Sequence, residues 1–153
     1  MPVRQVLLPI IVPIATLWVA RQERRILREG VPLSPAQLDD AHRLGVAEPE
    51  RVRTLTLDLV PLPGGGLVKA FGRLTGDRWD CTAGLTARYG IYLRAEYAHL
   101  RRLLAHELVH TRQYEQLGGI RPFLRQYLHE CLTVGYVSAP MEQEASEGAD
   151  RLA

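Results

Sequence analysis

Three residues within one short segment, His106, Glu107 and His110, have the types and spacing that zinc hydrolases use. They form the pattern H-E-x-x-H, and two histidines four residues apart on a helix lie on one face, about one turn apart. Both imidazoles can then bind a single tetrahedral Zn²⁺, which leaves room for one more protein ligand and a water. Glu107 can take a proton from the metal-bound water and later deliver it to a leaving amine. The spacing therefore predicts Zn²⁺ as a cofactor and peptide-bond hydrolysis as the reaction.

The residues around the motif predict the helix that this arrangement needs. Leu100, Leu104 and Leu108 recur every fourth residue, which is typical of the buried stripe of an amphipathic helix. No glycine or proline occurs from residue 97 to residue 117, and Gly118-Gly119 then ends the helix. The alternative is an ordinary helix with surface histidines, but the continuous helical context favours the metal site.

Other segments predict the elements that would surround this helix. Two of them, residues 51–60 and 84–94, alternate polar and apolar side chains, which indicates half-buried strands. Capping residues and apolar spacing predict helices over residues 34–44, 67–74 and 121–134, and from 141 to the end. We therefore expect an α+β fold, mostly helical, with a small antiparallel or mixed sheet packed on the H-E-x-x-H helix.

Length, charge and cysteine content narrow the class of protein. A chain of 153 residues can bury one modest core, and a net charge of +2 with scattered basic residues gives no indication of nucleic-acid binding. Cys81 and Cys131 are too few and too far apart to form a disulfide framework, so they are expected to be buried thiols. We expect a cytoplasmic protein whose partner is a peptide or protein substrate.

The N-terminal segment, residues 1–30, is expected to differ in character from the metallopeptidase-like domain of residues 31–153. Residues 6–20 are apolar and are followed by the basic run Arg21-Gln22-Glu23-Arg24-Arg25. Fifteen apolar residues are short of the roughly 20 that span a bilayer, and Pro9 and Pro13 are expected to interrupt a helix. The segment is interpreted as a packing or interfacial helix, a membrane anchor or a cleaved signal, and the first two leave membrane association open.

A catalytic zinc site needs a third protein ligand, which the residues alone leave open. The metzincin solution is excluded, because Gln113 stands where its glycine is required and Gln116 where its third histidine is required. A carboxylate on a following helix is then expected. Glu142 and Glu144 are two residues apart, so only one of them should face the metal. The candidates downstream are His129, Glu130, Cys131, Glu142, Glu144 and Glu147.

Residues 81–150 resemble small bacterial metallopeptidase domains of the gluzincin type. The resemblance rests on H-E-L-V-H-T-R-Q-Y-E-Q-L-G, then F-L-R-Q-Y-L, then P-M-E-Q-E-A. It implies a zincin-like fold, with His106 and His110 as zinc ligands, Glu107 as general base and Glu144 as third ligand. Glu130 is the main rival, because it follows His110 by twenty residues, a separation similar to that in thermolysin-like enzymes. The oxyanion-stabilising residue stays open among Tyr114, Tyr136 and His129.

Two other functions are compatible with the same residues. In the first, zinc only fastens helices together in a non-catalytic interaction module, and Glu107 has no chemical role. In the second, Cys81 is an upstream zinc ligand, as in peptide deformylases, although its neighbours Asp80 and Thr82 do not match that family.

Overall fold

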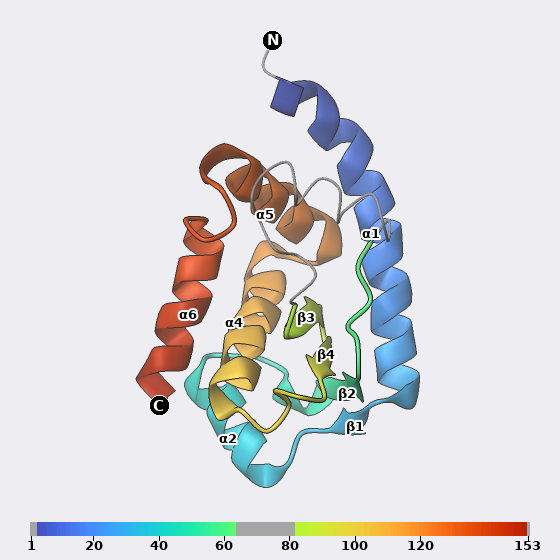
Figure 1. Ribbon diagram of the computed structural model, residues 1–153. Coiled ribbons are helices and arrows are strands. Elements are labelled where there is room, and N and C mark those ends of the chain that lie inside the picture. Colours follow the sequence, from blue (N-terminus) through green and yellow to red (C-terminus); the bar gives the residue numbers. More distant parts are fainter. Residues whose placement is uncertain (1–2, 64–81, 153) are drawn as a thin grey trace.

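The computed structural model describes residues 3–63 and 82–152 of the chain. Figure 1 shows α4 at the centre, with α6 on one side of it and the sheet on the other, and α1 along the outer edge of the molecule. The elements in chain order are α1 Val3–Glu29, β1 Val31–Pro32, α2 Pro35–Arg43, the 3₁₀ turn η1 Pro49–Arg51, β2 Arg53–Leu57, β3 Gly84–Ala87, β4 Gly90–Arg94, α4 Arg101–Leu117, α5 Ile120–Val134 and α6 Pro140–Leu152.

The four strands form one mixed sheet in the order β1-β2-β4-β3. β2 and β4 are parallel, while β1 pairs with β2 and β3 pairs with β4 in the antiparallel sense. The expected α+β class with a small mixed sheet is therefore confirmed. α4 lies against β3, and α1 lies against β4 and β2.

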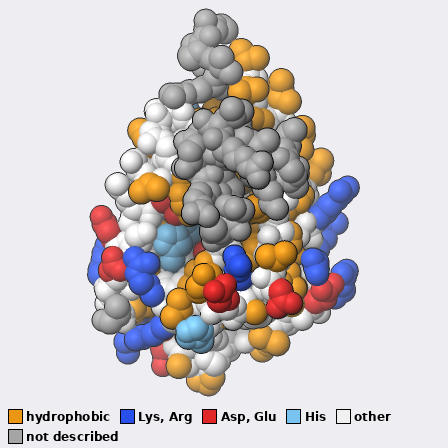
Figure 2. All heavy atoms as spheres, in the orientation of Figure 1, with side chains coloured by type: hydrophobic (Ala, Val, Ile, Leu, Met, Phe, Trp, Pro, Cys, Tyr) orange, Lys and Arg blue, Asp and Glu red, His pale blue; other side chains and the backbone are white. Residues whose placement is uncertain are grey.

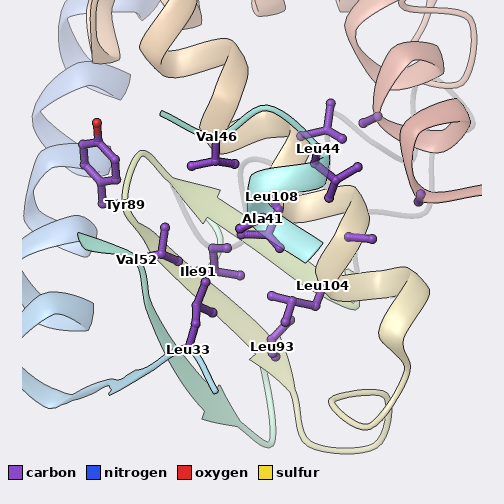
Figure 3. Packing of buried hydrophobic residues seen from close by; sticks show 14 residues of the cluster. Leu33, Ala41, Leu44, Val46, Val52, Tyr89, Ile91, Leu93, Leu104 and Leu108 are labelled. Carbon is purple, nitrogen blue, oxygen red and sulfur yellow. The ribbon is translucent and has the colours of Figure 1, made fainter. Parts of the chain in front are cut away.

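Successive side chains of β4 enter two different hydrophobic cores, because neighbouring residues of a strand point to opposite faces of the sheet. Ile91 and Leu93 pack with Leu104 and Leu108 of α4, as Figure 3 shows. Tyr92 packs in the other core, with residues of α1 and α5. The H-E-x-x-H helix is thus fixed on one face of the sheet, and α1 and α5 cover the other.

Residues 84–94, expected as a single strand, form a tight hairpin, and that expectation was wrong. The chain reverses at Arg88-Tyr89, where Arg88 adopts a left-handed conformation with φ 57°. Such a conformation is unfavourable for a residue with a side chain. Contacts from two helices hold it in place: Thr111 Oγ1 donates to the Arg88 carbonyl at 2.9 Å, and the Tyr89 N–H donates to Glu23 at 3.3 Å.

α1 is one continuous helix that contains Pro9 and Pro13, so the expected interruption is absent. Each proline removes one backbone hydrogen bond. Both prolines lie on the exposed side, while Val12 and Val19 on the other side are buried where α1 packs along α5. Packing of α1 along α5 therefore compensates for the two backbone hydrogen bonds that the prolines remove.

The other predicted elements agree with the structure within a few residues. The Ser34 side chain and the Gln37 side chain form a reciprocal capping box at the start of α2. Gly118 ends α4 in a left-handed conformation with φ 92°, where glycine carries no steric penalty. α5 and α6 begin within one residue of their predicted positions. The helix expected over residues 67–74 lies outside the described residues, as does Cys81.

Candidate metal centre

His106 and His110 face each other across one turn of α4, as their spacing predicts. Their Nε2 atoms are 3.2 Å apart. Glu142, in the first turn of α6, reaches both rings: its Oε2 lies 3.0 Å from His106 Nε2 and its Oε1 lies 3.2 Å from His110 Nε2. Within the described part of the chain, these three residues form the group of side chains that could hold a metal ion.

The chemistry and spacing of these donors fit Zn²⁺. Two imidazole nitrogens and a carboxylate are the donor set of many catalytic zinc sites. Ligand atoms about 2.0–2.2 Å from an ion at tetrahedral angles are roughly 3.3–3.5 Å from one another. The separations of 3.0–3.2 Å between the Nε2 and carboxylate atoms are close to that value. Small movements would therefore suffice to accept the ion.

Gln113 determines which nitrogen of His110 carries the proton. Its Nε2 donates to the Met141 carbonyl at 3.0 Å and to Glu144 Oε2 at 2.7 Å, so its amide orientation is fixed. The remaining Oε1 lies 2.7 Å from His110 Nδ1 and can only accept. The Nδ1–H therefore donates to Gln113. In the neutral ring Nε2, which faces His106 and Glu142, is then the nitrogen that is left to bind a metal.

Glu142 is buried and ionised. Burial alone would raise the pKa of its carboxyl, but hydrogen bonds from His106, His110 and Tyr127 hold that pKa well below its usual range. The Tyr127 hydroxyl donates to Oε1 at 2.5 Å, and Tyr136 also hydrogen-bonds to this carboxylate. Burial and the Glu142 charge raise the pKa of both tyrosines, so both are neutral donors.

His110 is affected by the same negative charges. Its burial would lower the pKa of the imidazole, but the hydrogen bond and charge of Glu142, with the charge of Glu107, raise it. Two carboxylates thus lie near the buried imidazole of His110 and the partly buried imidazole of His106, and this negative charge favours a cation.

Glu107, the predicted general base, is buried beside this group and does not enter it. Thr86 Oγ1 of β3 lies 2.6 Å from Glu107 Oε2 and 3.0 Å from the Glu107 carbonyl. Gly84 makes room for the carboxylate, because a Cβ there would be 2.6 Å from Glu107 Oε1. The negative charge of Glu107 contributes to raising the pKa of both His110 and Tyr136.

Glu144, the third ligand implied by the resemblance, does not reach the histidines. Its two oxygens accept from Arg112 Nη2 at 2.6 Å and from Gln113 Nε2 at 2.7 Å. The carboxylate that the structure brings to both histidines is Glu142, which the sequence had left among the alternatives. The side of α6 that faces α4 explains why Glu142 and not Glu144 reaches the histidines. Glu142 lies on the same stripe as the buried Ala145 and Ala149, three and seven residues later, and that stripe faces α4.

Glu130, the rival ligand, has a structural role. Its Oε2 accepts from the backbone N–H of Met141 at 2.9 Å, which caps the start of α6. His129 is exposed on α5, and Glu147 is paired with Arg151 at 3.8 Å on the surface of α6. Cys131 lies on α5, outside the described group of metal-binding side chains.

Comparisons with known proteins give no match. No protein-family model, no characterised protein and no solved structure matched this chain.

Proposed function

We propose that this chain is a zinc-dependent metallopeptidase with a zincin-like fold, in which His106, His110 and Glu142 bind the metal. One observation carries the proposal: Glu142, 32 residues beyond the motif, converges on both motif histidines within 3.2 Å. Glu107 is held beside them without joining the group. H-E-x-x-H motifs that arise by chance have no reason to acquire such a partner.

Each residue has a separate task in this proposal. Zn²⁺, when bound, lowers the pKa of its water to about 7 and polarises the scissile carbonyl. Glu107 accepts the proton of the attacking water and returns it to the leaving amine. The Thr86 hydroxyl orients the carboxylate of Glu107 through its hydrogen bond. The Tyr136 hydroxyl, near both Glu142 and Glu107, is the candidate donor to the oxyanion.

The substrate we propose is an extended peptide. β3 is at the end of the sheet and, among the described strands, pairs with β4 alone. It also carries Thr86 and Gly84, the two residues that contact Glu107. A peptide that added to this edge would run beside the general base, with its backbone bound by the strand.

Three variants test the proposal, with zinc content and cleavage of denatured casein measured on each. Glu107→Gln should keep one zinc per chain and lose at least about a hundredfold in rate, because the base is removed and no ligand is. Glu142→Ala should lose both zinc and activity. Glu147→Gln, an exposed change on the same helix as Glu142, should keep both.

A non-catalytic zinc-stabilised module is the second candidate, favoured by the Thr86 hydroxyl, whose one proton is shared between the side chain and the backbone carbonyl of Glu107. It predicts zinc in the wild type, no cleavage, and unfolding when the metal is removed. Cleavage that persists in Glu107→Gln would contradict the proposed mechanism. Absence of zinc from the reconstituted wild type would contradict both functions.

A further inference from the structure

The outer face of α1 is apolar along its first half. Val6, Ile10, Ile14 and Leu17 recur at spacings of four, four and three residues, which places them on one stripe of the helix. Their exposed fractions are 54, 58, 65 and 64%. Among the described helices, α1 also has the length and composition of a membrane span.

The same stripe becomes basic in the second half of α1. Arg21, Arg24 and Arg28 continue it at spacings of four, three and four residues after Leu17, and all three are exposed. Arg28 is paired with Glu29, whereas Arg21 and Arg24 form no ion pair with the described residues. Figure 2 shows apolar side chains along the upper edge of the molecule, where Figure 1 places α1, and Lys or Arg side chains below them.

The opposite face of α1 is part of the domain. Val19, Glu23 and Ile26 are buried, and Glu23 binds the β3–β4 turn. A Cβ on Gly90 of β4 would be 2.9 Å from the Ile26 side chain, so helix and sheet are in close contact. The second half of α1 therefore cannot enter hydrocarbon unless the fold opens.

The apolar stripe has the length of one leaflet. The twelve residues from Val6 to Leu17 rise about 18 Å at 1.5 Å per residue, against a hydrocarbon core of about 30 Å. Trp18 is partly exposed at the junction with the arginines, the depth at which tryptophan is common in membrane proteins. Arginines placed just beyond an apolar stripe match the phosphate layer of an anionic membrane.

We propose that α1 docks this protein on an anionic lipid bilayer. The stripe Val6, Ile10, Ile14 and Leu17 enters one leaflet, and Arg21, Arg24 and Arg28 bind lipid phosphates at its surface. The opposite side of the helix, with Val12 and Val19, stays packed along α5, and the sheet and α4 stay in water. This inference stands on α1 alone and does not depend on the proposed peptidase activity.

Co-sedimentation of the full chain with vesicles tests the proposal. Vesicles of phosphatidylcholine alone are compared with vesicles that contain roughly one third phosphatidylglycerol. We expect at least tenfold stronger binding to the anionic vesicles, and weaker binding as salt is added, because salt screens the arginines. The double variant Ile10→Asp with Ile14→Asp should lose binding to both vesicles. The triple change of Arg21, Arg24 and Arg28 to Gln should lose only the preference for anionic lipid.

Matched controls change exposed residues elsewhere. The double change Val31→Asp with Leu59→Asp is an equivalent pair of apolar-to-acidic changes outside α1. The triple change of Arg43, Arg102 and Arg151 to Gln removes the same charge as the triple change in α1. Both should bind like the wild type, and circular dichroism checks that each variant is folded. No wild-type binding, or equal loss in the control variants, would overturn the proposal. It would also be overturned by a wild-type dimer in solution that Ile10→Asp with Ile14→Asp converts to a monomer, since a second copy would then cover the stripe.

Discussion

Gln113 links Glu144 of α6 to His110 of α4. Its amide binds Glu144 and the Met141 carbonyl with its nitrogen and His110 with its oxygen. Arg112 in turn binds the other oxygen of Glu144. Glu144 therefore contacts the candidate metal centre only through Gln113, while Glu142 reaches the histidines directly.

The substitution Gln113→Leu tests this chain of contacts. The variant removes the acceptor for His110 Nδ1–H, so the imidazole is free to turn or to adopt the other tautomer. We expect zinc affinity to fall by about 10–100-fold, as for other partners of metal-bound histidines. The measurement is a competition titration with a chromophoric chelator.

The matched control for this prediction is Gln143→Leu, the same change at an exposed position of α6. It should leave zinc affinity unchanged. Thermal melting of both variants separates an effect on the metal from a loss of fold. A folded Gln113→Leu protein with wild-type affinity would show that the amide does not set the tautomer.

At the scale of elements, the contact between α4 and α6 brings Glu142 to the two histidines. α6 faces α4 with the small residues Ala145, Gly148 and Ala149, all buried. A Cβ on Gly148 would be 2.7 Å from Val109 Cγ2, closer than real contacts allow. The close approach of the two helices therefore depends on the missing side chain of Gly148, and it places Glu142 beside the histidines.

Gly148→Val should push α6 away from α4. We expect a loss of about 1–3 kcal/mol in the free energy of unfolding, because an extra side chain is forced into a packed interface. Zinc affinity should fall as well, since α6 carries Glu142. Urea denaturation and zinc titration measure the two effects.

Glu147→Val controls for the cost of a β-branched residue in α6, because Glu147 is exposed next to Gly148 on the same helix. Equal losses in the two variants would attribute the effect to helix propensity. A stable Gly148→Val protein with full zinc affinity would show that the helices tolerate a wider separation.

At the scale of the whole molecule, α5 connects the candidate metal centre to α1. Its Tyr127 donates to Glu142, and its Phe123 and Leu124 lie in the core that contains Val19 and Ile26 of α1. On the other side, Asp40 of α2 accepts two hydrogen bonds from Arg101 at the start of α4, at 2.8 and 2.7 Å. The motif helix is thus tied to the domain from both sides.

The Asp40–Arg101 pair predicts part of the pH dependence of stability. The hydrogen bond from Arg101 lowers the pKa of Asp40 in the folded state below its ordinary value of 3.8, although burial opposes the shift. Near pH 3.8 the unfolded chain then binds more protons than the folded chain. The pair therefore adds to the free energy of unfolding above that pH, and this stabilisation is lost as the pH falls through the folded-state pKa of Asp40.

Asp40→Asn should remove this contribution. The variant should be less stable than the wild type at neutral pH, and the gap should close as the solution is made more acidic than pH 3.8. Denaturant unfolding at a series of pH values measures it. Asp39→Asn, an exposed neighbour on α2, should follow the wild-type curve throughout. If the wild type and Asp40→Asn differed in free energy of unfolding by the same amount at every pH, the effect of Asp40 would come from packing and not from its charge.

Much of the fold and two of the three residues of the candidate metal centre could be predicted from local signals. Spacing on one helix places His106 and His110 together, because a helix fixes the geometry of residues four apart. The limits of α2 and α4 follow from Ser34, Gln37 and Gly118, whose effects are local. The mixed α+β class follows from the order of the periodic segments.

Only the tertiary structure decided the rest, because it depends on contacts between residues distant in the chain. Arg88-Tyr89 carries no turn signature of its own, and the hairpin there is held by Glu23 from α1 and Thr111 from α4. The choice of Glu142 over Glu144 depends on which face of α6 meets α4, and that is set by the close packing at Gly148. A sequence states which carboxylates are available, but the packing of two helices selects the one that faces the histidines.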